Sequence, residues 1–162
     1  MSRTGRAVVS IAACATLMAV GASTAAAKAS SVHYFAKRVY LRSSGANGHL
    51  LPPHSGLAVG DRVSTAFNDY AGDHTHHREQ ATASSDVVCV VTGSSTFLCD
   101  ETIAIGGSMI LGDDFVINLL SKGPTTFKIT GGTGIYRHAR GIVIARSVLG
   151  ESGLDLTIEL RS

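Results

Sequence analysis

Charged residues are scarce in this sequence, and their signs are nearly balanced. Only 16% of the 162 residues are charged, and 14 basic side chains stand against 12 acidic ones. Arg3 and Arg6 lie in a segment that we expect to be removed, which leaves 12 basic residues against 12 acidic ones in residues 28–162. A neutral domain without a basic cluster lacks the electrostatic footprint that nucleic acids or anionic membranes attract. We therefore expect neither nucleic acid nor a membrane among the partners of the mature chain.

Long apolar runs are equally rare, since the sequence has one, from Ala7 to Val20. It is shorter than the ~20 residues that a membrane-spanning helix needs. Two arginines precede the run, and Ala25-Ala26-Ala27 gives the small-residue pattern that signal peptidase reads. The sequence therefore predicts a secretory signal peptide over residues 1–27 and a secreted, extracellular chain that begins at Lys28. The alternatives are a membrane anchor and lipidation at Cys14.

Cysteine is limited to three residues, of which Cys14 would leave with the signal peptide. The mature chain keeps the pair Cys89 and Cys99. In an exported protein such a pair is expected to form a disulfide, although two separate buried thiols are the alternative. A bridge that closes so short a loop stabilises a domain by about 3 kcal/mol in the chain-entropy model.

No stretch after the signal peptide keeps the 3.6-residue apolar period of a helix. Short β-branched runs separated by Gly, Asn, Asp and Ser predict strands instead. Residues 42–60 form the longest predicted loop, and residues 93–95 form a short hairpin loop. We expect a single all-β domain over residues 28–162, an eight-stranded antiparallel β-barrel or a sandwich, with a first strand and long loop in 28–59 and the rest in 60–162. The predicted strands are 32–41, 61–71, 77–85, 86–92, 96–105, 108–111, 115–120, 125–130, 135–149 and 154–160.

Several well-known catalytic and binding motifs are missing as well. The sequence has no Gly-x-Ser-x-Gly nucleophile elbow. The glycine-rich turn of residues 131–134 is followed by β-like residues rather than a helix, so it predicts a tight bend between strands and not a phosphate loop. His74, His76 and His77 have no cysteine or carboxylate at a zinc spacing, and we expect no metal and no cofactor.

Acid–base candidates occur on the predicted strand 61–71, which contains Asn68, Asp69 and Tyr70. Neighbouring residues of a strand point to opposite faces. Asn68 and Tyr70 are therefore expected on one face of the sheet and Asp69 on the other.

A second group of candidates, Tyr136, Arg137 and Arg140, follows the glycine-rich turn. Arg140 has the same strand parity as Ile142 and Ile144. A charge in such a row faces a cavity, an interface or the surface, and the sequence leaves these alternatives open.

These residues lead to a resemblance. Residues 127–141, FKITGGTGIYRHARG, closely resemble a segment shared by plant dirigent proteins and allene oxide cyclases. Upstream, Gly60-Asp61 and Asn68-Asp69-Tyr70 are similar to a strand of the same superfamily, and residues 87–91 resemble a cysteine-containing strand of the cyclases. The resemblance spans roughly residues 60–160. It implies an eight-stranded antiparallel barrel with an apolar central cavity, commonly assembled as a homotrimer.

The resemblance also implies how such a barrel acts. Dirigent proteins hold phenoxy radicals or quinone methides and cyclases close a ring, both by positioning a reactive apolar intermediate in a dry cavity. The cyclases carry a carboxylate on their first strand, whereas residues 28–60 contain no Asp or Glu, and Ala139-Arg140-Gly141 favours the dirigent side. We expect a barrel that directs stereoselective coupling or cyclisation of an apolar or phenolic molecule without a cofactor. A non-catalytic ligand-binding barrel and an allene oxide cyclase-like isomerase are the alternatives.

Site residues follow from the resemblance and from the strand pattern together. The expected catalytic residues are Arg140, Asp69 and Tyr136, and the expected ligand-binding residues are Asn68, Tyr70 and Phe67.

Overall fold

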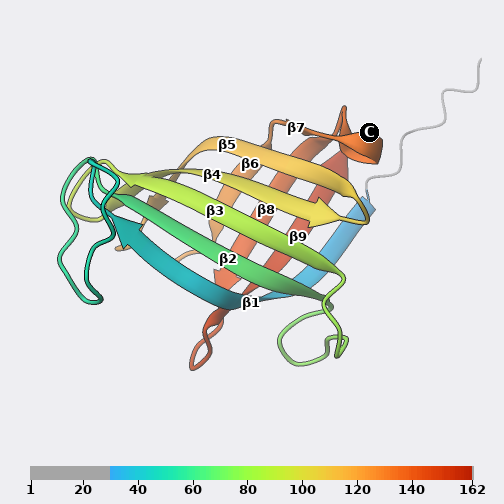
Figure 1. The fold of residues 1–162 in the computed structure, drawn as a ribbon. Coiled ribbons are helices and arrows are strands. Elements are labelled where there is room, and N and C mark those ends of the chain that lie inside the picture. The colour runs from blue at the N-terminus through green and yellow to red at the C-terminus, as the bar shows by residue number, and fades with distance from the viewer. Residues whose placement is uncertain (1–29, 162) are drawn as a thin grey trace, which may run out of the picture.

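Nine antiparallel strands follow one another around a single sheet in the computed structural model, which describes residues 30–161 (Figure 1). The strand order around the sheet is β6-β8-β9-β1-β2-β3-β4-β5-β7. The predicted signal peptide, residues 1–27, lies outside the described residues. The elements are β1 Ser30–Ser44, β2 Arg62–Ala71, β3 Ala83–Val91, β4 Thr96–Ile105, β5 Ser108–Asn118, β6 Thr125–Ile129, β7 Gly131–Gly132, the 3-10 turn η1 Gly134–Tyr136, β8 Arg140–Ser147 and β9 Gly153–Arg161.

The predicted all-β antiparallel barrel is confirmed, with one strand more than expected because the two-residue strand β7 pairs with β5. No helix within residues 30–161 is long and apolar enough to cross a membrane. Side chains alternate between the two faces of each strand, so every second residue points inward. The interior is filled mainly by aromatic and branched aliphatic side chains, among them Phe67, Ile103, Ile110, Phe127, Val143, Leu156 and Ile158.

The barrel closes between β5 and β6, which share no regular ladder of hydrogen bonds. The Thr130 N–H donates to the Leu111 carbonyl at 2.9 Å. Inside, the rings of Phe115 and Phe127 stack with centroids 4.2 Å apart. Gly112 allows this close approach, since a Cβ there would lie 2.5 Å from the Phe127 ring. The seam is therefore held mainly by aromatic packing.

The predicted disulfide is confirmed. Cys89 of β3 and Cys99 of β4 are directly opposite each other in the ladder and are bonded, with Cα atoms 4.0 Å apart. Both side chains point into the barrel, where Cys99 is 1% exposed. The bridge therefore fixes the register of the β3–β4 hairpin from the inside.

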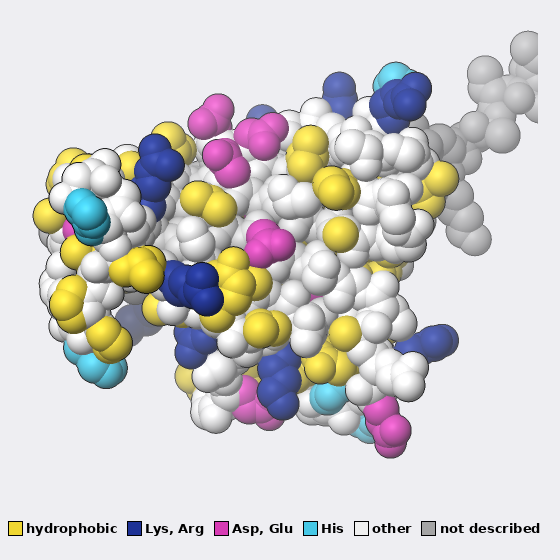
Figure 2. All heavy atoms as spheres, viewed as in Figure 1, with side chains coloured by type: hydrophobic (Ala, Val, Ile, Leu, Met, Phe, Trp, Pro, Cys, Tyr) yellow, Lys and Arg dark blue, Asp and Glu magenta, His cyan; other side chains and the backbone are white. Residues whose placement is uncertain are grey.

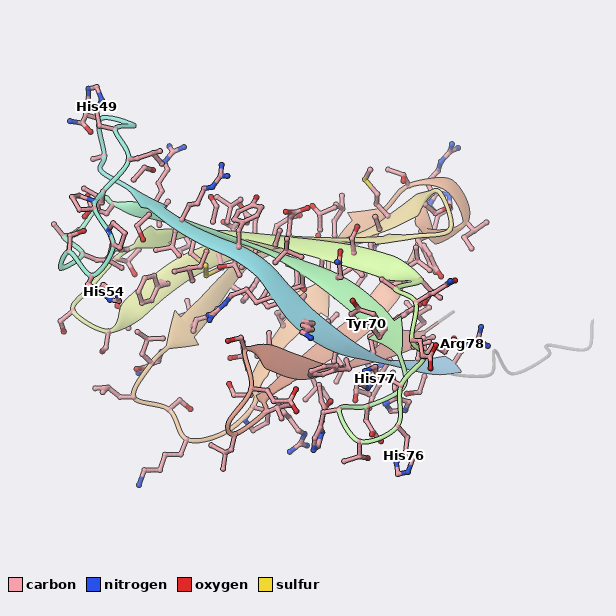
Figure 3. The ribbon with its side chains drawn as sticks, turned by 60° about the horizontal axis from the view of Figure 1, so that its bottom comes forward. His49, His54, Tyr70, His76, His77 and Arg78 are labelled. Atoms are coloured by element: carbon pink, nitrogen blue, oxygen red, sulfur yellow. A yellow bond between two sulfur atoms is a disulfide. The ribbon has the colours of Figure 1, made fainter. Side chains whose placement is uncertain are left out.

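The strand predicted over residues 77–85 is wrong, because residues 72–82 form a loop and β3 begins only at Ala83. This loop folds over the outer face of the barrel and covers Phe35 of β1, which is 2% exposed. The His77 ring lies 5.0 Å from that of Phe35 and 5.6 Å from that of Tyr70, and Figure 3 shows His77 beside Tyr70. Packing on the outward-facing Phe35 ring thus holds residues 77–82 in a loop, although the sequence pattern alone predicts a strand there.

Two further strand boundaries differ from the prediction. The expected turn at residues 112–114 is a bulge within the continuous strand β5, where Asp114 has a φ of 55° and its N–H donates to the Asp100 carboxylate. The strand expected over residues 135–149 is divided into η1 and the shorter β8. The glycine-rich turn contains the positive φ that was expected, at Gly134, where a Cβ would lie 2.2 Å from Ser108 Oγ.

We expect Gly141→Ala to destabilise the barrel strongly. Gly141 has a φ of 148°, and a Cβ there would lie 1.8 Å from the backbone oxygen of Glu159 in the neighbouring strand β9. The free energy of unfolding in urea should fall by about 3 kcal/mol or more. Gly131→Ala is the matched control, because nothing lies within 4 Å of its added Cβ. Equal losses in the two variants would contradict this account of Gly141.

Candidate functional site

One end of the barrel opens into an apolar cavity of about 320 Å³, here called the main cavity. A smaller recess of about 170 Å³, the inner pocket, continues from it, since Val87, Ile117 and Leu154 line both. Residues 45–61, 92–95, 119–124 and 148–152 connect the strands at this end. The remaining wall of the main cavity consists of Leu41, Ser43, Leu57, Val63, Thr65, Phe67, Cys89, Phe97 and Leu119.

Glu101 is the acidic residue in the wall of the inner pocket, which the Phe115 and Phe127 rings also line. It lies on β4 with the same inward parity as Cys99, and it is 6% exposed. Burial raises the pKa of its carboxyl to about 8, and the negative charge of Asp69 contributes to the rise. At neutral pH this side chain is therefore a neutral carboxylic acid that faces an apolar space.

Sequence analysis missed Glu101, although a signal for it was present. In the strand 96–105 every second residue is apolar, and Glu101 interrupts that face between Cys99 and Ile103. A carboxylate on the core face of a strand is rare unless it has a partner or a function.

Asp69 is the second buried acid and is fully enclosed, with 0% exposure. Its Oδ1 accepts a hydrogen bond from Ser85 Oγ at 3.1 Å, whereas its Oδ2 has no partner among the described residues. Burial raises the pKa of Asp69 to about 7, the Ser85 hydrogen bond lowers it in part, and the charge of Asp86 raises it. The two interior carboxyl groups thus oppose each other's ionisation.

Two tyrosines extend this polar group towards the opposite end of the barrel. Tyr34 of β1 is 5% exposed, and its pKa is raised by burial and by its neighbours Tyr136 and Asp69. Tyr136 belongs to η1 and lies in the wall of a second, more polar cleft of about 620 Å³ outside that end. Tyr34 therefore links two of the predicted catalytic residues, Asp69 and Tyr136.

The other predicted site residues divide between the two faces of the barrel. Phe67 points inward and lines the main cavity. Asn68 is exposed on the outer face, and Tyr70 packs there against His77, so the predicted alternation is observed but neither residue reaches the interior.

Arg140 also points away from the cavity. Its guanidinium donates hydrogen bonds to the backbone oxygens of Thr130 at 3.0 Å and Ala139 at 2.8 Å. Of the alternatives that the sequence left open, the structure therefore shows a surface residue that ties the turn before β8 to the end of β6.

The architecture matches solved structures closely enough to define the fold. A pyocyanin demethylase aligns with a TM-score of 0.58 and 19% identity over 82% of this chain and 100% of its own. The pterocarpan synthase dirigent proteins GePTS1 and PsPTS1 align with TM-scores of 0.56 and 0.54, at 15% and 20% identity, over 82% of this chain and 83% and 92% of theirs. The chain has the dirigent-type barrel fold. Neither the protein-family models nor the curated proteins that were compared gave a match.

The histidine-containing loop of this dirigent-type barrel has a structural role on the outer face. The backbone N–H of His74 donates to Asp155 of β9 at 2.8 Å, and the ring of His74 contacts the same carboxylate. Within residues 30–161 no group of three or more His, Cys, Asp or Glu side chains is placed to hold a metal ion.

We expect Glu101→Gln to change how the stability of the barrel depends on pH. The pKa of Glu101 rises from 4.5 to about 8 on folding, so between these values the folded chain keeps a proton that the unfolded chain has lost. The free energy of unfolding must therefore fall as the pH rises through this window, by on the order of 4 kcal/mol from this one group.

Glutamine cannot ionise, so Glu101→Gln should lose this part of the pH dependence. Its free energy of unfolding should therefore rise relative to that of the wild type between pH 5 and pH 8. Urea unfolding at several pH values measures the difference. Glu79→Gln, which removes an exposed acid of the loop 72–82, is the control and should keep the wild-type slope. Parallel curves for the wild type and Glu101→Gln would contradict the assignment.

Proposed function

We propose that this protein binds a small apolar or phenolic molecule in the main cavity and directs its stereoselective coupling or cyclisation without a cofactor, with Glu101 as the general acid. The observation that carries the proposal is the buried carboxyl of Glu101, neutral at pH 7, in the wall of the inner pocket. A carboxylic acid retained in an apolar cavity costs stability, which is expected where the group serves binding or chemistry.

The proposed chemistry follows from the protonation state. A neutral Glu101 donates a hydrogen bond to a carbonyl, enone or quinone methide oxygen of the bound molecule, and can transfer its proton as charge develops on that oxygen. The resulting carboxylate can then accept a proton from the reacting molecule, which restores the acid with no net change. The low dielectric constant of the aromatic surroundings strengthens both interactions.

Positioning supplies the stereochemical control in this proposal. Phe67 and Phe97 in the main cavity, and the stacked Phe115 and Phe127 in the inner pocket, offer flat apolar surfaces to a ring. A molecule held between them has few orientations left, which lowers the entropic barrier to ring closure or coupling. If radicals couple, an external oxidant must produce them, and the barrel orients them.

The remaining predicted catalytic residues have supporting roles in this proposal. The charge of Asp69 contributes to the raised pKa of Glu101, while Tyr34 and Tyr136 extend the polar group to the cleft at the far end. Arg140 acts from outside by holding the turn that carries Tyr136.

Location and assembly are part of the same proposal. A buried disulfide is consistent with an extracellular protein, and we propose that the chain is exported. We also propose a homotrimer. Exposed apolar side chains on the outer face of β4 and β5, Leu98 and the opposite Val116, support an assembly surface there.

A carrier of apolar molecules is the second candidate. It is favoured by the wall of the main cavity itself, which contains no charged side chain. An allene oxide cyclase-like isomerase would need the same acid, Glu101, and differs only in substrate. Among the fold neighbours one is a demethylase and two are synthases, so the fold does not choose between activities.

Binding of Prodan, an uncharged naphthalene ketone whose emission shifts to shorter wavelength in a dry site, distinguishes these candidates. If Glu101 donates to the ketone oxygen, the Kd should stay constant from pH 5 to pH 7 and rise at least about tenfold above pH 8, as the carboxyl ionises. Glu101→Gln keeps a donor and should bind Prodan with no such pH dependence.

Phe67→Ala should weaken binding at every pH, because it removes a wall of the cavity without touching the acid. Glu79→Gln, in the exposed loop outside the barrel, should behave as the wild type. A Kd that is independent of pH in the wild type would favour the carrier and remove the role of Glu101.

A further inference from the structure

Four loops lie at the end of the barrel where the main cavity opens, and three of them carry a strongly exposed leucine. We call residues 45–61, 119–124 and 148–152 the mouth loops. Leu50 is 73% exposed, Leu120 77% and Leu149 97%. Figures 1 and 2 show the loop between β1 and β2 at the left of the barrel, where apolar side chains lie among histidines.

The exposed apolar surface continues into the barrel. Leu41, Leu57 and Leu119 line the main cavity and yet remain 55%, 40% and 66% exposed. Exposed apolar side chains therefore occur both at the loop tips and at the outer edge of the cavity wall.

The charges around the mouth are mainly positive. Residues 45–60 and 119–124 contain no acid, and the latter segment carries Lys122. Asp61 is 8% exposed, and its carboxylate accepts a hydrogen bond from the Ala58 N–H at 2.8 Å. Asp61 and Glu151 are thus the acids at this end, against Lys122, Arg42 on β1 and the exposed Arg62 at the start of β2. His49 and His54 lie in the same region (Figure 3).

The opposite end of the barrel differs in character. Its longest loop, residues 72–82, contains three histidines, and the carboxylates of Asp73 and of Asp155 on β9 accept hydrogen bonds from its backbone N–H groups. Ile135 of η1, 83% exposed, and Met109 of β5, 43% exposed, are large apolar side chains that project there. The molecule is thus polarised along the barrel axis, with the apolar end at the cavity mouth.

We propose that the mouth loops dock on the surface of a lipid bilayer that contains anionic lipids, so that the apolar ligand passes between the bilayer and the main cavity without crossing water. Single leucines that project from separate loops suit insertion among acyl chains, and the cationic surroundings suit the headgroups. The core of a protein interface is instead a packed, continuous patch enriched in aromatic residues. The expectation of no membrane partner rested on the net charge of the mature chain. Net charge does not show where on the surface the charged and apolar side chains lie.

The sequence contains no tryptophan, so a single introduced tryptophan reports on its own surroundings. We would prepare Leu149→Trp and, as the matched control at the other end, Ile135→Trp, and add vesicles of phosphatidylcholine and phosphatidylglycerol in equal amounts. The emission of Leu149→Trp should shift to shorter wavelength and be quenched by lipids with brominated acyl chains. The emission of Ile135→Trp should not change.

Flotation with the same vesicles tests the energetics. Leu120→Ser combined with Leu149→Ser should weaken vesicle binding at least about tenfold, whereas Met109→Ser combined with Ile135→Ser, two exposed apolar positions at the other end, should bind as the wild type. The proposal is overturned if the wild type does not bind vesicles or if both double variants bind equally. It is also overturned if ultracentrifugation shows that the mouth leucines join two copies of the chain.

The docking proposal and the proposed chemistry can be refuted independently of each other. Prodan binding in vesicle-free buffer reports on the cavity and Glu101, so a variant that keeps Prodan binding but loses vesicle binding has lost only the docking surface. Loss of the pH effect in Prodan binding would leave the vesicle result standing.

Discussion

The closure of the barrel between β5 and β6 is the constraint on which the rest of the structure depends. These strands lack a regular ladder, and the stacked rings of Phe115 and Phe127 join them from the inside. The same two rings form the walls beside Glu101. The contact that completes the barrel therefore also creates the apolar surroundings that raise the pKa of that carboxyl, and the stability of the fold and the character of the site have one origin.

Much of the fold could be predicted from the sequence, because strand alternation, turn residues and cysteine pairing are local signals. The β3–β4 hairpin with its disulfide and the opposite faces of Asn68 and Asp69 belong to this class. The loop over residues 72–82 could not be predicted, because it is fixed by Phe35, a residue far away in sequence. The bulge at Asp114 was read as a turn for a similar reason, since the Asp100 carboxylate that accepts a hydrogen bond from the Asp114 N–H lies on the neighbouring strand.

The candidate site was only partly visible in the sequence. Asp69 was recognised by its position on a strand, but its proximity to Tyr34 and Glu101 depends on the curvature of the whole sheet. Arg140 was expected to be a catalytic residue because its motif resembles one that lines a cavity. Its guanidinium instead lies outside the barrel and donates hydrogen bonds to two backbone oxygens. Residue type and spacing identify candidates, whereas the inward or outward direction of a side chain depends on which face the sheet encloses.

The position of the disulfide has a consequence for the chemistry of the empty and the occupied barrel. Cys89 forms part of the wall of the main cavity, so a thiol reductant that enters through the mouth meets the bridge where a guest molecule would sit. In the proposed complex, a bound guest would stand between the reductant and the sulfur atoms. The rate of thiol exchange at this bridge would then report, without an added label, how long the cavity stays filled.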